Sequence, residues 1–263
     1  MKLKMVRLLI FSFLQVFYCP SYGQTRAELT TLECEQDSCI WNLDIKQITK
    51  EEFDDAYKHS VSFNIRPSII KDRRLDNELI ECAIKMGKNL SIIYPDEDME
   101  SIYDTYLDIQ PYSLTTEKSG TIYAVQFTDP VCSFSVICYN ENGIWRGDSV
   151  IVDTEKAAFS KDGIIAGAQG FDCDDYALIH FYQILNTPSG KRVHRIATYS
   201  NSELKDIENL DKTWAVDTRK EARMCWFDNP NTLYVEGYTI ISASPVYYKI
   251  TLSCIKAYSP IIL

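Results

Sequence analysis

The sequence predicts an α+β fold in which an N-terminal helical and mixed segment packs on a C-terminal, mainly antiparallel β-sheet or sandwich. Three observations support this prediction. Apolar residues recur with helical spacing in several segments before Pro111. From Thr121 onward, short alternating segments are separated by turn residues. Tyrosine contributes 17 residues, and its ring suits half-buried sheet surfaces because the hydroxyl stays in water.

Residues 1–23 have the three-part pattern of a secretory signal peptide. Lys2, Lys4 and Arg7 precede the apolar run Leu8–Phe17, and Ser21–Gly23 places small residues where a signal peptidase cleaves. The apolar run is too short to cross a bilayer as a helix. The pattern therefore predicts export to the periplasm or the cell surface.

The mature chain is expected to begin at Gln24. A lipid anchor on Cys19 is the alternative, but Tyr18 stands where lipoprotein signals usually carry a small residue. No later stretch reaches the ~20 consecutive apolar residues of a membrane-spanning helix, so no transmembrane segment is predicted.

Residues 24–115 are predicted as a mixed α/β segment. Residues 41–45 alternate as a strand, and residues 61–65 form a second, shorter strand. The run from Thr49 to Glu52 is a capping box, which predicts a helix with Phe53 on its apolar face.

Two further helices are expected in this segment. Asp76 is expected to cap the first, and Gly87 to mark its end. Pro95 and the acids that follow it open the second, where negative charge favours a helix N-terminus. Its apolar stripe is predicted to comprise Met99, Ile102, Tyr103 and Tyr106.

Residues 116–263 are predicted as an antiparallel β-rich domain, or as the continuation of one domain with residues 24–115. The expected strands are 121–128, 131–139, 144–152, 163–168, 176–185, 192–199, 222–227, 233–241 and 246–254. A short helical link is expected at 155–159.

Cysteine usage agrees with export. Loss of Cys19 from the nine cysteines leaves Cys34, Cys39, Cys82, Cys132, Cys138, Cys173, Cys225 and Cys254. An even number in an exported chain predicts disulfides, and some of these residues can instead be buried thiols. The sequence contains no C-x-x-C and no zinc-type spacing.

The mature chain is strongly acidic. The net charge is −10 overall, and removing Lys2, Lys4 and Arg7 leaves 24 basic against 37 acidic residues, a balance of −13. Such a surface repels nucleic acid and anionic lipid, so we expect no nucleic-acid partner. A basic protein or a cation fits the charge better, although acidity also serves solubility.

Three pieces of the C-terminal half carry a resemblance. They are Ser160–Gly163, Asp172-Cys173 and Cys225–Leu233. Together, over about residues 160–240, they resemble small β modules of uncharacterised exported bacterial envelope proteins, with Lys161 in place of the usual proline. The resemblance implies a β architecture and no particular reaction.

The acidic loop at residues 171–176 is the most suggestive local feature. Asp172, Asp174 and Asp175 supply the oxygen ligands that Ca²⁺ prefers, but the calcium-loop glycine and distal glutamate are missing. The ordinary interpretation is turn capping, and a protein-facing acidic patch is a second. We expect no cofactor, with calcium at this loop as the alternative.

Neither the histidines nor any catalytic motif in the sequence indicates a metal site or an enzyme active site. A loop at 187–190 sets a register in which His194 faces Gln183 and His180 faces Ala197, on opposite sides of the sheet. The two imidazoles then cannot share a metal ion. The sequence has no G-x-S-x-G nucleophile elbow and no glycine-rich phosphate loop, and no carboxylate pair stands out among its acids.

These observations favour an exported, non-catalytic binding protein. Its acidic face would dock or neutralise another exported protein of basic character. The expected contact residues are Asp172, Asp174, Asp175, Trp226 and Tyr247, because Tyr and Trp often supply contact area beside charged groups. The alternative is a hydrolase of envelope glycan or peptide that uses paired carboxylates.

Overall fold

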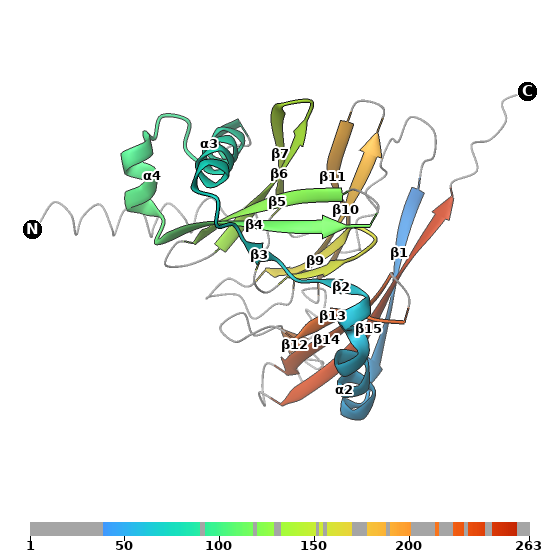
Figure 1. The fold of residues 1–263 in the computed structure, drawn as a ribbon. Coiled ribbons are helices and arrows are strands. Elements are labelled where there is room, and N and C mark those ends of the chain that lie inside the picture. The colour runs from blue at the N-terminus through green and yellow to red at the C-terminus, as the bar shows by residue number, and fades with distance from the viewer. Residues whose placement is uncertain are drawn as a thin grey trace, which may run out of the picture.

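A computed structural model of the chain shows a mostly-β protein. It describes residues 39–89, 93–117, 120–128, 133–150, 153–154, 157–169, 178–187, 190–200, 214–215, 223–228, 231–239 and 244–256. Three antiparallel sheets account for most of these residues, and three α-helices pack on the outer sides of the first and third of them (Figure 1). The predicted α+β class, with a helical N-terminal layer on a C-terminal sheet, is therefore wrong.

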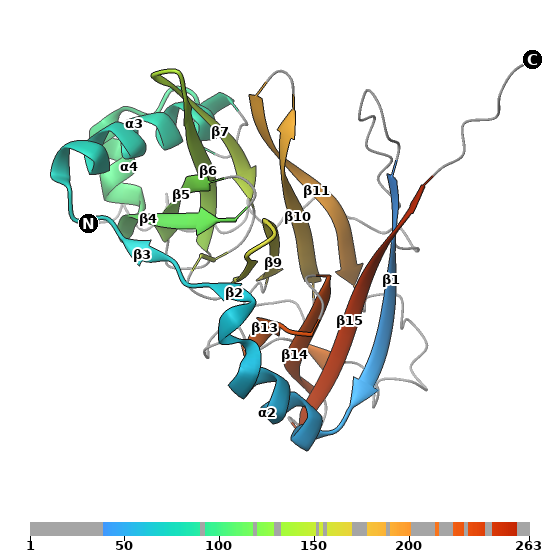
Figure 2. The same cartoon turned by 45° about the vertical axis from the view of Figure 1, so that its right-hand side comes forward.

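The first sheet joins the two ends of the described chain. Its strands are β1 (Cys39–Ile48), β12 (Trp214–Ala215), β13 (Met224–Trp226), β14 (Thr232–Thr239) and β15 (Pro245–Lys256). Their order is β1-β15-β14-β12, and β13 also pairs with β14. The long strands β1 and β15 run side by side along the whole length of β1 (Figure 2).

The second sheet lies in the middle of the molecule. Its order is β11-β10-β9-β8-β2. The strands are β2 (Asn64–Ile65), β8 (Ala158–Ser160), β9 (Ile164–Gln169), β10 (Leu178–Thr187) and β11 (Gly190–Ser200). The expected helical link at 155–159 is replaced, in its described part, by strand β8, whose Phe159 is buried.

The third sheet is built from neighbouring strands in sequence order. They are β3 (Ser68–Ile69), β4 (Asp108–Thr116), β5 (Gly120–Thr128), β6 (Ser133–Glu141) and β7 (Ile144–Val150). Strand β4 was not among the predicted strands, and it contains Pro111, a residue that is rare in central strands. Its outer neighbour β3 is only two residues long, so most of β4 is an edge where proline is tolerated.

The helices pack at the two outer ends of this arrangement. They are α2 (Lys50–His59), α3 (Arg73–Asn89) and α4 (Met99–Thr105), with a 3₁₀ turn η1 (Ser60–Ser62) after α2. The predicted cap of α2 is confirmed, since the Thr49 hydroxyl accepts a hydrogen bond from the Glu52 amide at 3.2 Å. The expected strand at 61–65 is reduced to β2 behind η1.

Helix α3 is longer than the sequence predicted. Asp72, not Asp76, accepts the first-turn amide of Arg74, at 3.0 Å. Gly87 lies inside the helix rather than at its end. A Cβ at Gly87 would stand 2.7 Å from the Ile93 Cδ1 atom, so this glycine permits a close approach instead of ending the helix.

Apolar clusters between the sheets define the layers. One cluster joins the first and second sheets through residues such as Leu233 and Phe181. Another joins the second and third sheets, with Ile165 and Ile137 among its members. A third lies between the third sheet and helices α3 and α4. The second sheet is therefore buried on both faces, and Figure 2 shows the sheets following one another across the molecule.

The segments 24–115 and 116–263 contribute strands to the same sheets. Strand β1 pairs with β15, β2 with β8, and β4 with β5. The predicted boundary between these two segments, at residues 115 and 116, falls at the end of β4, where the strand is still paired with β5. Among the described helices, none combines the length and the apolar character that crossing a membrane requires.

Candidate functional site

Of the five residues expected to contact a partner, the two that the structure describes, Trp226 and Tyr247, are buried in the protein core. Asp172, Asp174 and Asp175 lie outside the described residues. Trp226 is 0% exposed between the first and second sheets, where its indole N–H donates to the Ala158 carbonyl at 3.0 Å. Tyr247 is 6% exposed, and its ring centroid lies 5.1 Å from that of Phe53. Both aromatic side chains belong to the packed core, so we do not include them in the surface defined below.

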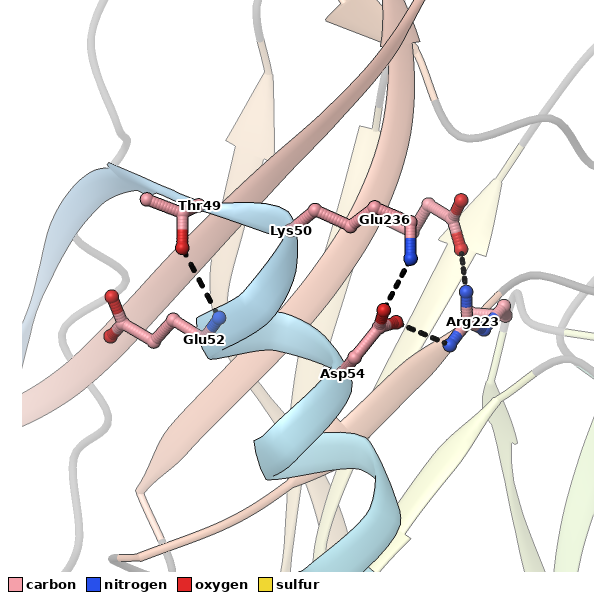
Figure 3. Close-up of polar contacts among 6 residues, drawn as sticks. All are labelled: Thr49, Lys50, Glu52, Asp54, Arg223 and Glu236. Atoms are coloured by element: carbon pink, nitrogen blue, oxygen red, sulfur yellow. Dashed lines mark hydrogen bonds and ion pairs between the residues drawn. The ribbon is translucent and has the colours of Figure 1, made fainter.

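A charged cluster surrounds Arg223 (Figure 3). The guanidinium donates to Glu236 at 2.8 Å from one nitrogen and to Asp54 at 3.2 Å from another. Lys50 also donates to Asp54. The Arg223 carbon stands 4.9 Å and 4.7 Å from the ring centroids of Phe53 and Tyr57, within cation–π range.

The contacts of this cluster indicate a structural role. The hydrogen bond from Lys50, followed by that from Arg223, lowers the pKa of Asp54, so its carboxylate stays ionised. The two bases and two acids compensate each other in charge. Arg223, on the chain before β13, thereby fastens α2 to Glu236 of β14.

The two histidines of the β10–β11 hairpin lie on opposite faces, as predicted. The expected pairing of Gln183 with His194 is confirmed, whereas His180 pairs with Thr198 instead of Ala197. A bulge between Phe181 and Tyr182 shifts the register by one residue on β11. The His180 Nδ1 atom lies 3.0 Å from the Thr198 hydroxyl.

Burial, with a smaller contribution from Arg195, lowers the pKa of His180 to about 4 from its ordinary 6.5. The unfolded chain therefore takes up a proton between these two values while the folded chain does not. The contribution of neutral His180 to the free energy of unfolding is fully present above pH 6.5 and is lost as the pH falls towards 4. We expect His180 to make the protein about 2 kcal/mol less stable at pH 4.5 than at pH 7. Urea unfolding at both pH values measures this, and His180→Gln should lose that part of the pH dependence. An unchanged pH dependence in the variant would contradict it.

The segment that contains α4 combines acidic side chains with exposed apolar side chains. Residues 94–108 contain six acids and no lysine, arginine or histidine. Within them, four large apolar side chains are between 41% and 73% exposed: Tyr94, Met99, Tyr103 and Leu107. Exposed acids on the same segment are Asp96, Asp98, Glu100, Asp104 and Asp108. We call these nine residues the α4 surface.

The packing of Ile102 in α4, and of Tyr106 directly after it, explains why the α4 surface faces outward. Ile102 is fully buried in the cluster below α3, and Tyr106 packs edge-on against Phe127 with ring centroids 5.3 Å apart. Because 3.6 residues make a turn, Met99 and Tyr103 lie on a neighbouring stripe, next to Glu100 and Asp104. The four residues predicted to form the apolar stripe therefore divide, with Ile102 and Tyr106 packed against the core and Met99 and Tyr103 exposed.

Two contacts hold the start of this segment in place. Asp98 caps α4 by accepting the Ser101 amide at 2.8 Å, and this backbone hydrogen bond lowers the pKa of Asp98. Lys88 of α3 donates to the backbone carbonyl of Glu97. Burial raises the pKa of the Glu97 carboxyl. The acidic turn is thus attached to α3 and not only to its own helix.

The acids of the α4 surface are visible in the sequence, but the favourable charge of a helix N-terminus also explains acids at this place. Acids at Asp96 and Asp98 were assigned to the helix N-terminus, which is correct for Asp98. Glu100 also lies in the first turn, but Asp104 and Asp108 continue the negative charge beyond it, where the helix dipole gives no reason for it. Their spacing beside exposed aromatic residues points to a contact surface.

Comparisons with known proteins give no relative. No protein-family model, no curated protein and no solved structure matches the chain. Within the described ranges, no group of three or more His, Cys, Asp or Glu side chains could hold a metal ion. The calcium alternative at Asp172, Asp174 and Asp175 stays a prediction, since those residues are not described.

Proposed function

We propose that the protein is a non-catalytic binding protein that engages a basic segment of another protein through the α4 surface. The supporting observation is the four exposed apolar side chains within a segment that carries six acids and no base. Contiguous exposed apolar side chains mark interaction sites on soluble proteins, and aromatic residues are enriched in their binding hot spots.

The charge of the surface selects the chemistry of the partner. A partner with lysine or arginine beside apolar residues pairs its cations with Glu100, Asp104 and Asp108 while its apolar groups cover Tyr103 and Leu107. Opposite charge speeds the encounter, and the apolar contacts provide most of the affinity. Export to the envelope, as the signal peptide predicts, would place this partner among exported proteins.

The test compares two variants of the α4 surface with matched controls. The charge variant carries Glu100→Gln, Asp104→Asn and Asp108→Asn, and its control carries Glu51→Gln, Glu52→Gln and Asp55→Asn on α2. The apolar variant carries Tyr103→Ala and Leu107→Ala. Its control carries Val61→Ala and Ile144→Ala, which are 69% and 60% exposed.

Immobilised wild-type and variant proteins are incubated with extract of the cells that produce the chain, and the captured proteins are quantified by mass spectrometry. The expected result is a basic protein retained by the wild type and both controls. Once purified, it should bind each α4 variant at least about tenfold more weakly, or ~1.4 kcal/mol. Equal loss in the α2 control would indicate general charge attraction and contradict the proposal. So would equal capture by all five proteins.

A further inference from the structure

Two free thiols meet beneath helix α3. Cys82 lies on α3 and Cys138 on β6, and both belong to the apolar cluster between that helix and the third sheet. Each thiol is the largest influence on the pKa of the other, as expected for side chains that lie next to each other in this cluster. They come from positions 56 residues apart in the chain, so only the fold brings them together.

The structure explains why the two sulfurs lie so close. Along β6, Val136 and Cys138 face α3 while Ile137 and Tyr139 face the second sheet. Opposite Cys138 on β7 stands Gly147. A Cβ at Gly147 would be 3.0 Å from the Met86 Cγ atom of α3, so glycine at this position lets the helix approach the sheet closely.

The two thiols differ in reactivity. The neighbouring Cys138 thiol, helped by the nearby Lys85, lowers the pKa of Cys82 against the opposing effect of burial. The Cys82 thiol and burial together raise the pKa of Cys138 well above its usual value. Cys82 also keeps 7% exposure on the helix, whereas Cys138 has 0%. Cys82 is therefore the better attacking thiolate, and Cys138 remains a protonated thiol behind it.

We propose that Cys82 and Cys138 form a disulfide that fastens α3 to β6, by exchange with a small-molecule disulfide such as glutathione disulfide. The Cys82 thiolate attacks one sulfur of the oxidant, which releases one thiolate and leaves a mixed disulfide on Cys82. Cys138 then loses its proton and attacks the Cys82 sulfur, releasing the second glutathione thiolate. Two protein thiols are oxidised and one small disulfide is reduced to two thiols.

The packing favours this closure. Cys82 of α3 and Cys138 on the side of β6 that faces α3 share one buried cluster. A cysteine side chain reorients by rotation about a single bond, which lets two facing sulfurs reach the covalent S–S length of about 2 Å. Among the described residues, Cys225 is another free thiol; it lies in a different cluster beneath α2, and burial raises its pKa to about 12. Cys225 is the matched control, as a buried thiol next to neither partner. The inference does not depend on the α4 surface.

The experiment treats the reduced, folded protein with glutathione disulfide, blocks the remaining thiols after unfolding, and maps the peptides by mass spectrometry. In the wild type and in Cys225→Ser, the peptide with Cys82 should be joined to that with Cys138. Cys138→Ser should instead accumulate glutathione on Cys82. Cys82→Ser should leave Cys138 as a thiol.

Each other outcome overturns the proposal. A wild type in which both residues stay alkylatable, or in which Cys82 stops at the mixed disulfide, shows that the pair does not close. Glutathione on Cys138 in Cys82→Ser reverses the assigned order of attack. Equal joining of the two peptides in denaturant shows that the folded arrangement does not direct it.

Discussion

Replacement of Trp226 by alanine is expected to lower the free energy of unfolding by about 3–5 kcal/mol, because it empties a fully buried site between two sheets. The indole packs edge-on towards Phe181, with ring centroids 6.4 Å apart. Its N–H also satisfies the Ala158 carbonyl of β8. Urea-induced unfolding of the wild type and variant measures the difference.

A matched variant separates the ring from its hydrogen bond. Trp226→Phe keeps most of the apolar volume and leaves the Ala158 carbonyl without this donor, so we expect a smaller loss of about 1–2 kcal/mol. Asn64 holds the Trp226 backbone through both its N–H and its carbonyl, at 2.9 Å and 2.8 Å, and stays intact in both variants. A loss below about 1 kcal/mol in Trp226→Ala would contradict the burial of this ring.

Replacement of Arg223 by alanine is expected to cost about 3 kcal/mol of stability. The change leaves Glu236, whose side chain is only 10% exposed, without its ion-pair partner. It also removes the guanidinium from the rings of Phe53 and Tyr57 on α2. Part of the ion-pair contribution is screened by water, since Arg223 itself is 34% exposed, so the estimate lies at the low end for buried pairs.

The control for this cluster is Lys50→Ala. Lys50 is 58% exposed and donates to Asp54, so we expect almost no change in the free energy of unfolding, because water screens an exposed ion pair. Arg223→Lys keeps the charge but cannot contact Asp54 and Glu236 at once with a planar fork, and it should fall between the two. Chemical denaturation ranks the three variants. Equal effects of Lys50→Ala and Arg223→Ala would mean that charge number, not the Arg223 geometry, stabilises α2.

Local signals in the sequence predicted what depends on local structure. The capping residue Thr49 starts α2, and the turn at 187–190 sets the pairing of Gln183 with His194. The bulge beyond it was not predictable, because nothing in the strand sequence marks Ile196 as the extra residue.

The sequence did not reveal which distant strands pair, and this is why the fold class was wrong. Strand β1 has the alternation of a strand, but its partner β15 is specified by tertiary packing. Strands β2, β3 and β8 are two or three residues long, too short for any periodic signal. They exist because their neighbours provide hydrogen-bonding edges, which no local pattern records.

The candidate surface was only partly predictable for a related reason. Helical spacing groups Met99, Ile102, Tyr103 and Tyr106 on one side of α4. The sheet below α4 has room for Ile102 and Tyr106, which contact Phe127 and its neighbours, and leaves the other two in water. Trp226 and Tyr247 show the converse, since their strands place them against apolar neighbours.

The pairing of β1 with β15 has a consequence for biosynthesis. Their register runs from Cys39 opposite Lys256 to Ile48 opposite Tyr247, so the partner of β1 is translated about 200 residues after it. The strands of the third sheet from β4 to β7, by contrast, are consecutive in the chain and are available to pair early. Until the last strand emerges from the ribosome, the nascent chain carries β1 as an unpaired edge. Completion of the first sheet therefore waits for the synthesis of β15, and a chain shortened before Pro245 leaves β1 unpaired and prone to association with other chains.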